Sequence, residues 1–434
     1  MNAQEVKEYI LDFQKSVLPS LIDRELKIGD TKKIKSIIGP RRAGKTFFMY
    51  QNIKKLISAG VKKENILYIN FENPRLVEVN FKEIREIVKL HWQIYPESTK
   101  EELYIFIDEP QNIKNWELAV RALHDEGFNI FLTGSSSKLL NKEIATSLRG
   151  RTTSYIILPF SFKEFLKMKN LNIDLMHLSS KEKSILLNLL DEYLEFGGFP
   201  EVILESITEN KIRTINEYYE LVVYRDIVER YNIKNTQLVR WLIKSLASSF
   251  SNEFSVHKMF LILKSRGLKI SKNTLYSYLS MLEDSMFVFL IGKFKYSVRK
   301  KELSINKAYL CDIGFAKLAE VTKDIGKKME NVVFLELYRQ RKPLTEIFYW
   351  SDGENEVDFV ITEGLKVKNL IQVCYDIDNY DTKKREIKAL LKSSKELRCK
   401  NLSIITYDKE GEEKIYNRKI KYLPLWKYLL TGNI

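Results

Sequence analysis

The segment SIIGPRRAGKT, residues Ser36–Thr46, decides the fold of the first part of this chain. It fits the pattern G-x-x-x-x-G-K-[ST], with Gly39, Gly44, Lys45 and Thr46 at the fixed positions. The apolar residues before the first glycine predict a strand, and the residues after the threonine predict the start of a helix. A strand, this loop and a helix in that order indicate a phosphate-binding loop (P-loop).

The P-loop pattern predicts how a nucleotide and a metal ion are held. The backbone N–H groups of the loop and the helix N-terminus form a cradle for phosphates. Lys45 is expected to neutralise the β- and γ-phosphates, and Thr46 is expected to hold Mg²⁺, so ATP and Mg²⁺ are the expected cofactors. The residues expected to contact the nucleotide are Gly39, Pro40, Arg41, Arg42, Ala43, Gly44, Lys45, Thr46 and Phe47.

A strand predicted downstream ends in two acidic residues. Leu103–Ile107 is continuously apolar, as a parallel strand buried on both faces would be, and Asp108 and Glu109 follow it. The carboxyl ends of such strands carry the chemistry of open α/β sheets. We expect Asp108 to orient Mg²⁺ and Glu109 to act as general base on the attacking water. The alternative, a solvated acidic turn, fits less well after a buried strand downstream of a P-loop.

Hydroxyl and arginine side chains follow the next predicted strand, Phe128–Ser136. Thr133 and Ser135 are candidates for a sensor that contacts the γ-phosphate through a water molecule. The alternative is a turn that caps the next helix. Arg149 and Arg151 are candidates for an arginine finger that reaches the γ-phosphate of a neighbouring subunit, or for surface ion pairs.

Seven segments carry a family resemblance, in the order GPRRAGKT, YINFENPR, YIFIDEPQ, FLTGSSSKLL, LRGR, LPFSFKEF and YLEFGGFPEV. Together they resemble the prokaryotic and archaeal AAA-type ATPases (extended AAA, STAND-related) that are joined to a C-terminal domain of unknown function. The resemblance runs from the first strand to about Pro200 and implies ATP hydrolysis. The alternation of strands and helices independently predicts an α/β fold with a doubly wound parallel sheet.

The middle of the chain predicts a helical lid and then a winged helix. Ser255–Phe260 begins one short helix, and Ile270–Tyr276 begins a second, with Ser271 as its N-cap. Met286–Ile291 and Ala308–Cys311 are expected to be wing strands. The alternative role of such a winged helix is to pack against neighbouring parts of the protein.

Basic and aromatic residues in this region indicate DNA contact. Lys272, Asn273 and Tyr276 are expected on the recognition helix. The segment between the wing strands contains further cations suited to phosphate contacts. These cations are Lys293, Lys295, Arg299, Lys300 and Lys301.

The C-terminal region resembles the PD-(D/E)XK nuclease fold: a helix with Glu330, a strand with Asp358, and a strand with Gln372. The resemblance implies a Mg²⁺ site and a lysine two residues after the last of these, where this chain has Cys374. From the neutral amide and the missing lysine we expect an inactive nuclease-like module, retained for binding nucleic acid or a partner. The lysines that could replace the missing one by migration are Lys366 and Lys368.

Size and charge set the remaining limits. The 434 residues allow three domains, expected at 1–195, 196–318 and 319–434, and the net charge of +14 favours polyanionic partners. The chain has no apolar run of membrane-spanning length and no apolar N-terminal signal, so we expect a cytoplasmic protein. Three cysteines are too few and too scattered to predict a disulfide framework or a zinc site.

Three functional hypotheses follow from these observations. The first is an ATPase that couples nucleotide state to binding of nucleic acid or a partner by the C-terminal half, and a finger acting in trans would require a homo-oligomer or ring. The second is a slow nucleotide-gated signalling switch or scaffold with no DNA substrate. The third, an ATP-dependent nuclease, is disfavoured by Cys374.

Overall fold

The computed structural model divides into two compact units, Met1–Leu158 (the first unit) and Pro159–Ile434 (the second unit). The described residues are 1–99, 102–134, 148, 150–171, 173–175, 177–297, 304–319 and 324–433. The expected boundaries at residues 195 and 318 both fall inside the second unit. None of the described helices is long and apolar enough to cross a membrane.

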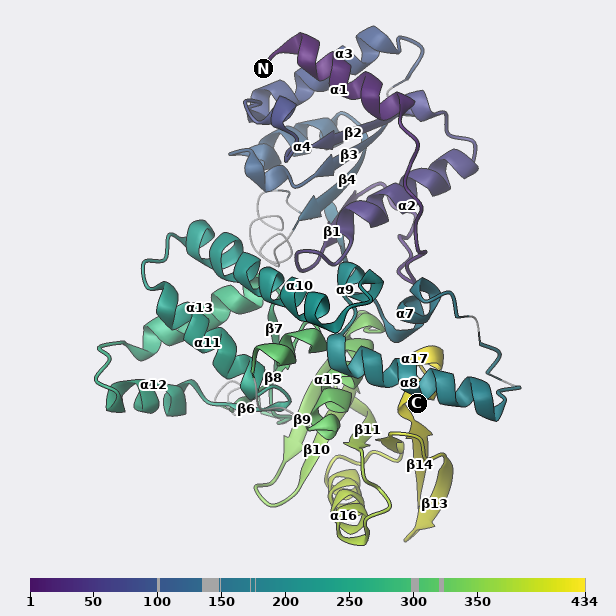
Figure 1. Ribbon diagram of the computed structural model, residues 1–434, viewed down its shortest axis with the longest axis vertical. Helices are drawn as coiled ribbons and strands as arrows, with labels where there is room; N and C mark the ends of the chain where they lie inside the picture. Colours follow the sequence, from purple (N-terminus) through teal and green to yellow (C-terminus); the bar gives the residue numbers. More distant parts are fainter. Residues whose placement is uncertain are drawn as a thin grey trace. The chain divides into compact units, whose positions relative to one another are not determined.

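The first unit is built on a five-stranded sheet in the order β2-β3-β4-β1-β5 (Figure 1). All neighbouring strands run parallel, so the parallel α/β sheet expected from the sequence is confirmed. The strands are β1 (Ile34–Ile38), β2 (Ile66–Asn70), β3 (Tyr104–Asp108), β4 (Asn129–Gly134) and β5 (Thr152–Ile156). Because β1, β4 and β3 are neighbours that run parallel, their carboxyl ends lie at the same edge of the sheet.

Helices cover both faces of this sheet, which makes three layers (Figure 1). The apolar side chains of α1, α3 and α4 pack with Ile105 and Ile107 on one face. Those of α2 pack with Phe106 on the other face, as the alternation of side chains along a strand requires. The helices are α1 (Ala3–Lys15), α2 (Lys45–Ser58), α3 (Ile84–Ile94) and α4 (Trp116–Asp125). Short 3₁₀ turns span Lys63–Asn65, Pro74–Leu76, Phe81–Glu83 and Pro110–Asn112.

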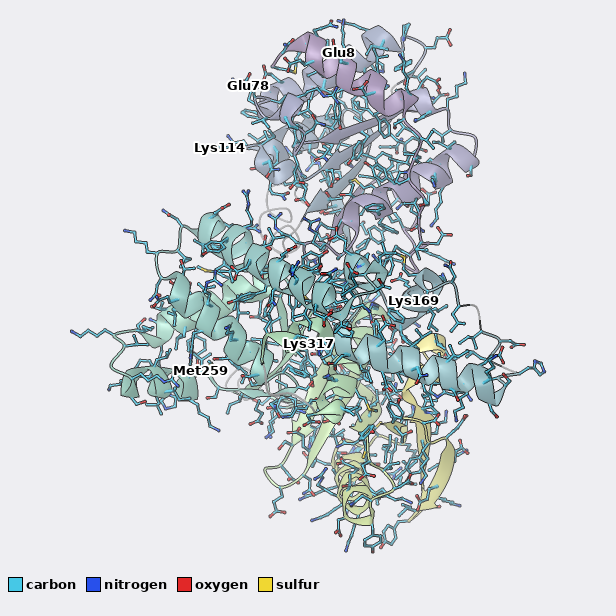
Figure 2. The ribbon with its side chains drawn as sticks, viewed as in Figure 1. Glu8, Glu78, Lys114, Lys169, Met259 and Lys317 are labelled. Carbon is cyan, nitrogen blue, oxygen red and sulfur yellow. The ribbon has the colours of Figure 1, made fainter. Side chains whose placement is uncertain are left out.

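The second unit begins with a helical region. Its elements are α7 (Phe162–Met168), α8 (Ser180–Phe196), α9 (Pro200–Leu204), α10 (Thr208–Leu221), a π-helix (Val222–Glu229) and α11 (Thr236–Ser248). The helix that begins at Thr208 continues into π geometry from Val222. On α8, Glu192 forms ion pairs with Lys169 and Lys211. Glu195 on the same helix pairs with Lys317 and Lys328, and Figure 2 labels Lys169 and Lys317.

A small antiparallel sheet and two helices follow. The strands are β6 (Asn252–Phe254), β7 (Val288–Ile291) and β8 (Asn306–Leu310), in the order β6-β8-β7, and the helices are α12 (Val256–Ser265) and α13 (Lys272–Asp284). The side chain of Ser271 accepts the backbone N–H of Thr274, so the expected N-cap is confirmed. A 3₁₀ segment, Ile313–Leu318, leaves this sheet.

The rest of the second unit is a six-stranded mixed sheet in the order β13-β14-β12-β11-β10-β9. Its strands are β9 (Thr345–Ser351), β10 (Glu356–Glu363), β11 (Lys366–Cys374), β12 (Leu402–Thr406), β13 (Gly411–Ile415) and β14 (Arg418–Pro424). The helices are α15 (Ile325–Arg339), α16 (Tyr380–Glu396) and α17 (Leu425–Thr431). The strands β9, β10 and β11 pair antiparallel, and α16 then connects β11 to the parallel strand β12.

A buried carboxylate fixes the end of α8. Gly197 ends this helix with φ 77° and ψ −161°, a conformation open almost only to glycine. A Cβ atom there would lie 1.8 Å from Oδ1 of Asp312. Asp312 accepts the backbone N–H groups of Gly198 (2.7 Å) and Gly314 (2.8 Å), and burial raises the pKa of its carboxyl to about 7. The glycine therefore lets one carboxylate hold two backbone segments together.

This contact predicts that Gly197→Ala destabilises the second unit by roughly 3–5 kcal/mol, because backbone strain and a clash with Asp312 add together. Gly364→Ala is the matched control, since Gly364 also has positive φ (59°) and nothing within 4 Å of its Cβ position. The control is expected to lose about 1 kcal/mol. Urea unfolding of both variants measures the difference, and equal losses would contradict the clash.

Candidate nucleotide-binding site

The P-loop connects β1 to α2, and two glycines make its path possible. A Cβ atom on Gly39 would lie 1.9 Å from the carbonyl oxygen of Ile157, so only glycine fits there. Gly44 has φ 90° and directly precedes α2. The buried Lys45 folds back over the loop, where its Nζ donates to the carbonyl oxygens of Gly39 (3.3 Å) and Pro40 (3.2 Å). The loop is thus closed around the lysine at the N-terminus of a fourteen-residue helix.

Asp108, at the end of β3, is the centre of a buried hydrogen-bond network. Its Oδ2 accepts the hydroxyl of Thr46 at 2.7 Å and the hydroxyl of Tyr68 at 2.9 Å. Its Oδ1 accepts the hydroxyl of Thr133 from β4. The network therefore joins the middle of β2 and the carboxyl ends of β3 and β4 to the first turn of α2.

Glu109 lies beside this network in an uncommon backbone conformation. Its φ of 51° and ψ of 50° place a non-glycine residue in the left-handed region, which is frequent at functional sites. Its backbone N–H donates to the hydroxyl of Thr133 at 3.0 Å, and Gln111 donates to its carboxylate. Its Oε1 is 3.8 Å from Nζ of Lys45. The candidate base and the candidate phosphate-binding cation thus face each other.

Burial and charge act together on the acidic groups here. Burial, and then the neighbouring charge of Glu109, raise the pKa of Asp108, while the three hydroxyl donors oppose that rise. Burial and the same Glu109 charge also raise the pKa of Glu72, which follows β2. A cation placed among these carboxylates would relieve their mutual repulsion.

The residues fit a phosphate with Mg²⁺. The pair formed by Thr46 Oγ1 and Asp108 Oδ2 supplies hard oxygen atoms of the kind that Mg²⁺ takes from a protein when it keeps several waters. Lys45 and the N-terminus of α2 supply positive charge for the phosphates. Hydroxyl, carboxylate and ammonium groups therefore stand where the P-loop pattern predicts them.

Arg24 supports the loop from outside. It belongs to the segment 16–33, which has no regular structure and runs beside α2. Its guanidinium donates to the carbonyl oxygens of Ala43 (2.8 Å) and Leu158 (2.5 Å), and its backbone N–H donates to the side chain of Gln51 at 3.0 Å. Arg24 thereby ties the P-loop, α2 and the segment after β5 to one another.

The other predicted site residues have mixed positions. Ala43 is buried, Arg42 has φ 63°, and Phe47 is exposed on the first turn of α2. Arg151 forms a two-point ion pair with Asp125, through its Nε at 2.6 Å and its Nη2 at 3.2 Å. Ser135 and Arg149 lie outside the described residues.

Sequence reasoning missed Arg24, Tyr68 and Gln111. Tyr68 could have been found from the alternation of side chains along β2. Its neighbours Leu67 and Ile69 pack on one face of the sheet, so the hydroxyl of Tyr68 lies on the opposite face. Arg24 gave no signal, because the segment around it has no periodicity.

A second cluster of predicted residues meets in the second unit. The side chain of Gln372 accepts the backbone N–H of Asp358 at 3.2 Å, and a buried lysine, Lys307, joins Asp358 to Glu330. From the sequence, Lys366 and Lys368 were the candidates to replace the missing lysine. Lys368 instead forms an ion pair with Glu363 at the far end of β11. The lysine in the cluster comes instead from β8. Among the described residues, no group of three or more His, Cys, Asp or Glu side chains is arranged to hold a metal ion.

Comparison with known families places the site in a class. Residues 31–166 match the family described as an AAA domain, and this span contains the P-loop and the Asp108–Glu109 pair. Residues 187–324 and 325–428 match two domains of unknown function (DUF8612 and DUF4143). The chain is therefore a nucleotide-binding protein of the AAA type with further domains after its P-loop domain.

The chain belongs to the same family as the uncharacterized protein MJ1544 of the archaeon Methanocaldococcus jannaschii. The two are 42% identical over 98% of this chain and 95% of that protein. An uncharacterized protein of Haemophilus influenzae is 32% identical over 80% of this chain and 84% of its own length.

Some solved structures are distantly similar. Cdc6p from Pyrobaculum aerophilum is 11% identical, with 69% of this chain and 88% of that chain covered and a TM-score of 0.26. A DNA polymerase III gamma subunit-related protein from Thermotoga maritima is 15% identical, with 66% and 100% covered and a TM-score of 0.25.

The contacts of Arg24 predict that Arg24→Gln weakens ATP binding about tenfold, because the loop loses charge-assisted hydrogen bonds that hold its shape. Lys27→Gln is the matched control, since it removes one positive charge from an exposed position of the same segment. Titration with a fluorescent ATP analogue measures both affinities. If the two variants bind equally well, Arg24 does not position the loop.

Proposed function

We propose that the protein is a Mg²⁺-dependent ATPase whose nucleotide state controls binding of a polyanionic partner by the second unit. The observation that carries the ATPase proposal is the geometry at the strand ends. Thr46 and Asp108 form an oxygen pair at 2.7 Å, and Glu109 lies 3.8 Å from Lys45. A metal-binding pair, a phosphate-binding cation and a general base thus lie along one edge of the sheet.

Each residue has a distinct role in this proposal. Lys45 leaves the loop carbonyls and binds the β- and γ-phosphates. Mg²⁺, when bound, would neutralise phosphate charge beside Thr46 and Asp108. Glu109 accepts a proton from the attacking water, and Thr133 holds the backbone of Glu109 in place. The left-handed conformation of Glu109 keeps its carboxylate close to Lys45.

An arginine finger would add a requirement for assembly. Arg151 is paired with the half-exposed Asp125 and would have to leave this ion pair to reach a neighbouring nucleotide. Arg149 remains the other candidate, outside the described residues. A finger acting in trans would make ATP turnover rise with protein concentration, in a homo-oligomer or ring.

The chain order α11-β6-α12-α13-β7-β8 supports a winged helix in the second unit. Two helices joined by a short turn lie between β6 and the antiparallel pair β7–β8, and α13 would be the recognition helix. Likewise, the order α15-β9-β10-β11-α16-β12 supports the nuclease-like assignment of the C-terminal sheet. Both assignments are part of this proposal.

The surface of α12 and α13 supports an anionic partner. The sequence from Ser255 to Leu282 contains no acidic residue, and Lys272, Asn273 and Tyr276 on α13 are exposed. The cations of this stretch are Lys258, Lys264, Arg266, Lys269 and Lys272, and all five are exposed. Exposed lysines and an exposed tyrosine suit phosphates and bases, which favours DNA as the partner.

The site predicts that one substitution impairs ATP binding and that another impairs ATP hydrolysis alone. Lys45→Ala should lower ATP affinity at least about tenfold, because a buried charge-assisted contact is lost. Glu109→Gln should bind ATP normally but hydrolyse it about a hundredfold more slowly, because the general base is removed. Lys55→Ala, at an exposed position of the same helix as Lys45, is the matched control. Equal turnover in wild type and Glu109→Gln would contradict the role given to Glu109.

The α13 surface predicts salt-dependent DNA binding. Lys272→Ala should weaken binding to duplex DNA of any sequence and reduce the slope of log affinity against log salt by about 1, because one phosphate contact is lost. Lys181→Ala, which removes an exposed cation from α8, should leave the slope unchanged. Fluorescence anisotropy over a series of salt concentrations measures both. Absence of DNA binding at low salt would contradict the DNA-binding role, and the winged helix would then serve only to pack against neighbouring parts of the protein.

A further inference from the structure

Lys307 lies at the centre of the second cluster although nothing in the sequence marked it. It comes from β8, and its side chain is only 2% exposed. Its Nζ is 3.0 Å from Oε1 of Glu330 on α15 and 3.3 Å from Oδ1 of Asp358 on β10. The carboxylate of Glu356, also on β10, lies 2.5 Å away and reaches the surface. One ammonium group therefore contacts carboxylates from two different elements.

The two buried carboxylates are satisfied without a metal ion. Besides Lys307, Oε1 of Glu330 accepts the hydroxyl of the fully buried Tyr309 at 2.7 Å. Asp358 accepts the backbone N–H of Val373 at 2.9 Å through its other oxygen. Hydrogen bonds and one buried positive charge therefore meet the needs of both groups.

The third expected ligand is also occupied. The amide oxygen of Gln372 accepts the backbone N–H of Asp358, while its amide nitrogen donates to the backbone of Glu356 (3.3 Å) and to Glu386. Cys374, at the position where the nuclease pattern has a lysine, is buried. A Mg²⁺ ion needs nearly octahedral oxygen ligands at about 2.0–2.1 Å. The residues present do not fit that ion, since an ammonium group already stands among the carboxylates.

The same lysine joins two parts of the second unit. Because β8 belongs to the three-stranded sheet, its contacts with α15 and β10 connect this sheet to the C-terminal one. Asn331 on α15 adds two hydrogen bonds to the backbone of Leu310 on β8, at 2.8 and 3.1 Å. The hydroxyl of Tyr349 on β9 donates to the carbonyl oxygen of Ile305 at 2.6 Å. The cluster thus has the connections of a structural joint.

We propose that Lys307 is a built-in cation that takes the place of the divalent metal, so that the C-terminal sheet is a metal-independent module unable to hydrolyse phosphodiesters. The inference rests on the proposed nuclease-like assignment of this sheet. In this proposal the Lys307 cluster has a structural role, which is to connect the proposed winged helix to the C-terminal sheet. Nucleotide-dependent movement of one would then carry the other with it.

The first test uses the wild-type protein without nucleotide. The thermal unfolding midpoints of the wild type and of Asp358→Asn are measured with and without millimolar Mn²⁺. In a second assay, cleavage of supercoiled plasmid by both proteins is measured with Mg²⁺ and with Mn²⁺. No Mn²⁺ effect and no cleavage that depends on Asp358 are expected. A Mn²⁺ effect lost in Asp108→Asn belongs to the P-loop site and bears on the ATPase proposal instead. A Mn²⁺ effect or cleavage lost in Asp358→Asn would overturn the inference.

The second test removes the cation. Lys307→Met should lower the unfolding midpoint by about 10 °C, because two buried carboxylates lose their counter-charge. Adding Glu330→Gln and Asp358→Asn to this variant should recover at least half of the loss. Lys366→Met, at an exposed position of β11, is the control and should change nothing. An unfolding midpoint of the triple variant below that of Lys307→Met would overturn the inference. If Lys307→Met alone does not fold, the inference still requires the triple variant to fold.

Discussion

The carboxylate of Asp108 is the point on which the first unit depends. A buried charge must be compensated, and here three hydroxyl groups do so, from Thr46, Tyr68 and Thr133. Each hydroxyl comes from a different element, so the carboxylate fixes the first turn of α2 against β2 and β4. The parallel order β2-β3-β4-β1 brings the carboxyl ends of these strands to one edge. The P-loop, the proposed base Glu109 and the sensor candidate Thr133 derive their relative positions from this arrangement.

Local patterns in the sequence were sufficient for most of this site. Gly39, Lys45 and Thr46 have a fixed spacing, and Asp108 follows a continuously apolar strand, so both positions could be predicted and both lie at the site. The role of Arg24 could not be predicted, because it depends on where an irregular segment crosses carbonyl oxygens at Ala43 and Leu158. Contacts between segments so distant in the sequence leave no periodic signal.

The second unit shows the same limit more strongly. The sequence predicted Glu330, Asp358 and Gln372 as neighbours, and the structure brings them together. The sequence also indicated that the nuclease lysine is missing, and the candidates to replace it, Lys366 and Lys368, lie nearby in the sequence. The lysine found in the cluster is Lys307, on a strand of a different sheet. Electrostatic compensation is a property of the folded arrangement, and any element that passes the buried carboxylates can supply it.

A common principle connects the two clusters. In both, buried carboxylates from a β-strand are satisfied by side chains from other elements, but the charges differ. Around Asp108 the donors are neutral hydroxyls, and the cation Lys45 lies beside the neighbouring Glu109. Around Asp358 a cation is already in place. This difference in charge supports the proposals that the first cluster binds a metal ion and that the second does not.

The most direct test is ATP turnover by the purified wild-type protein, with Mg²⁺ and with EDTA. The account predicts hydrolysis that requires Mg²⁺. Binding of ATP with no turnover under either condition, even with DNA present, would contradict it.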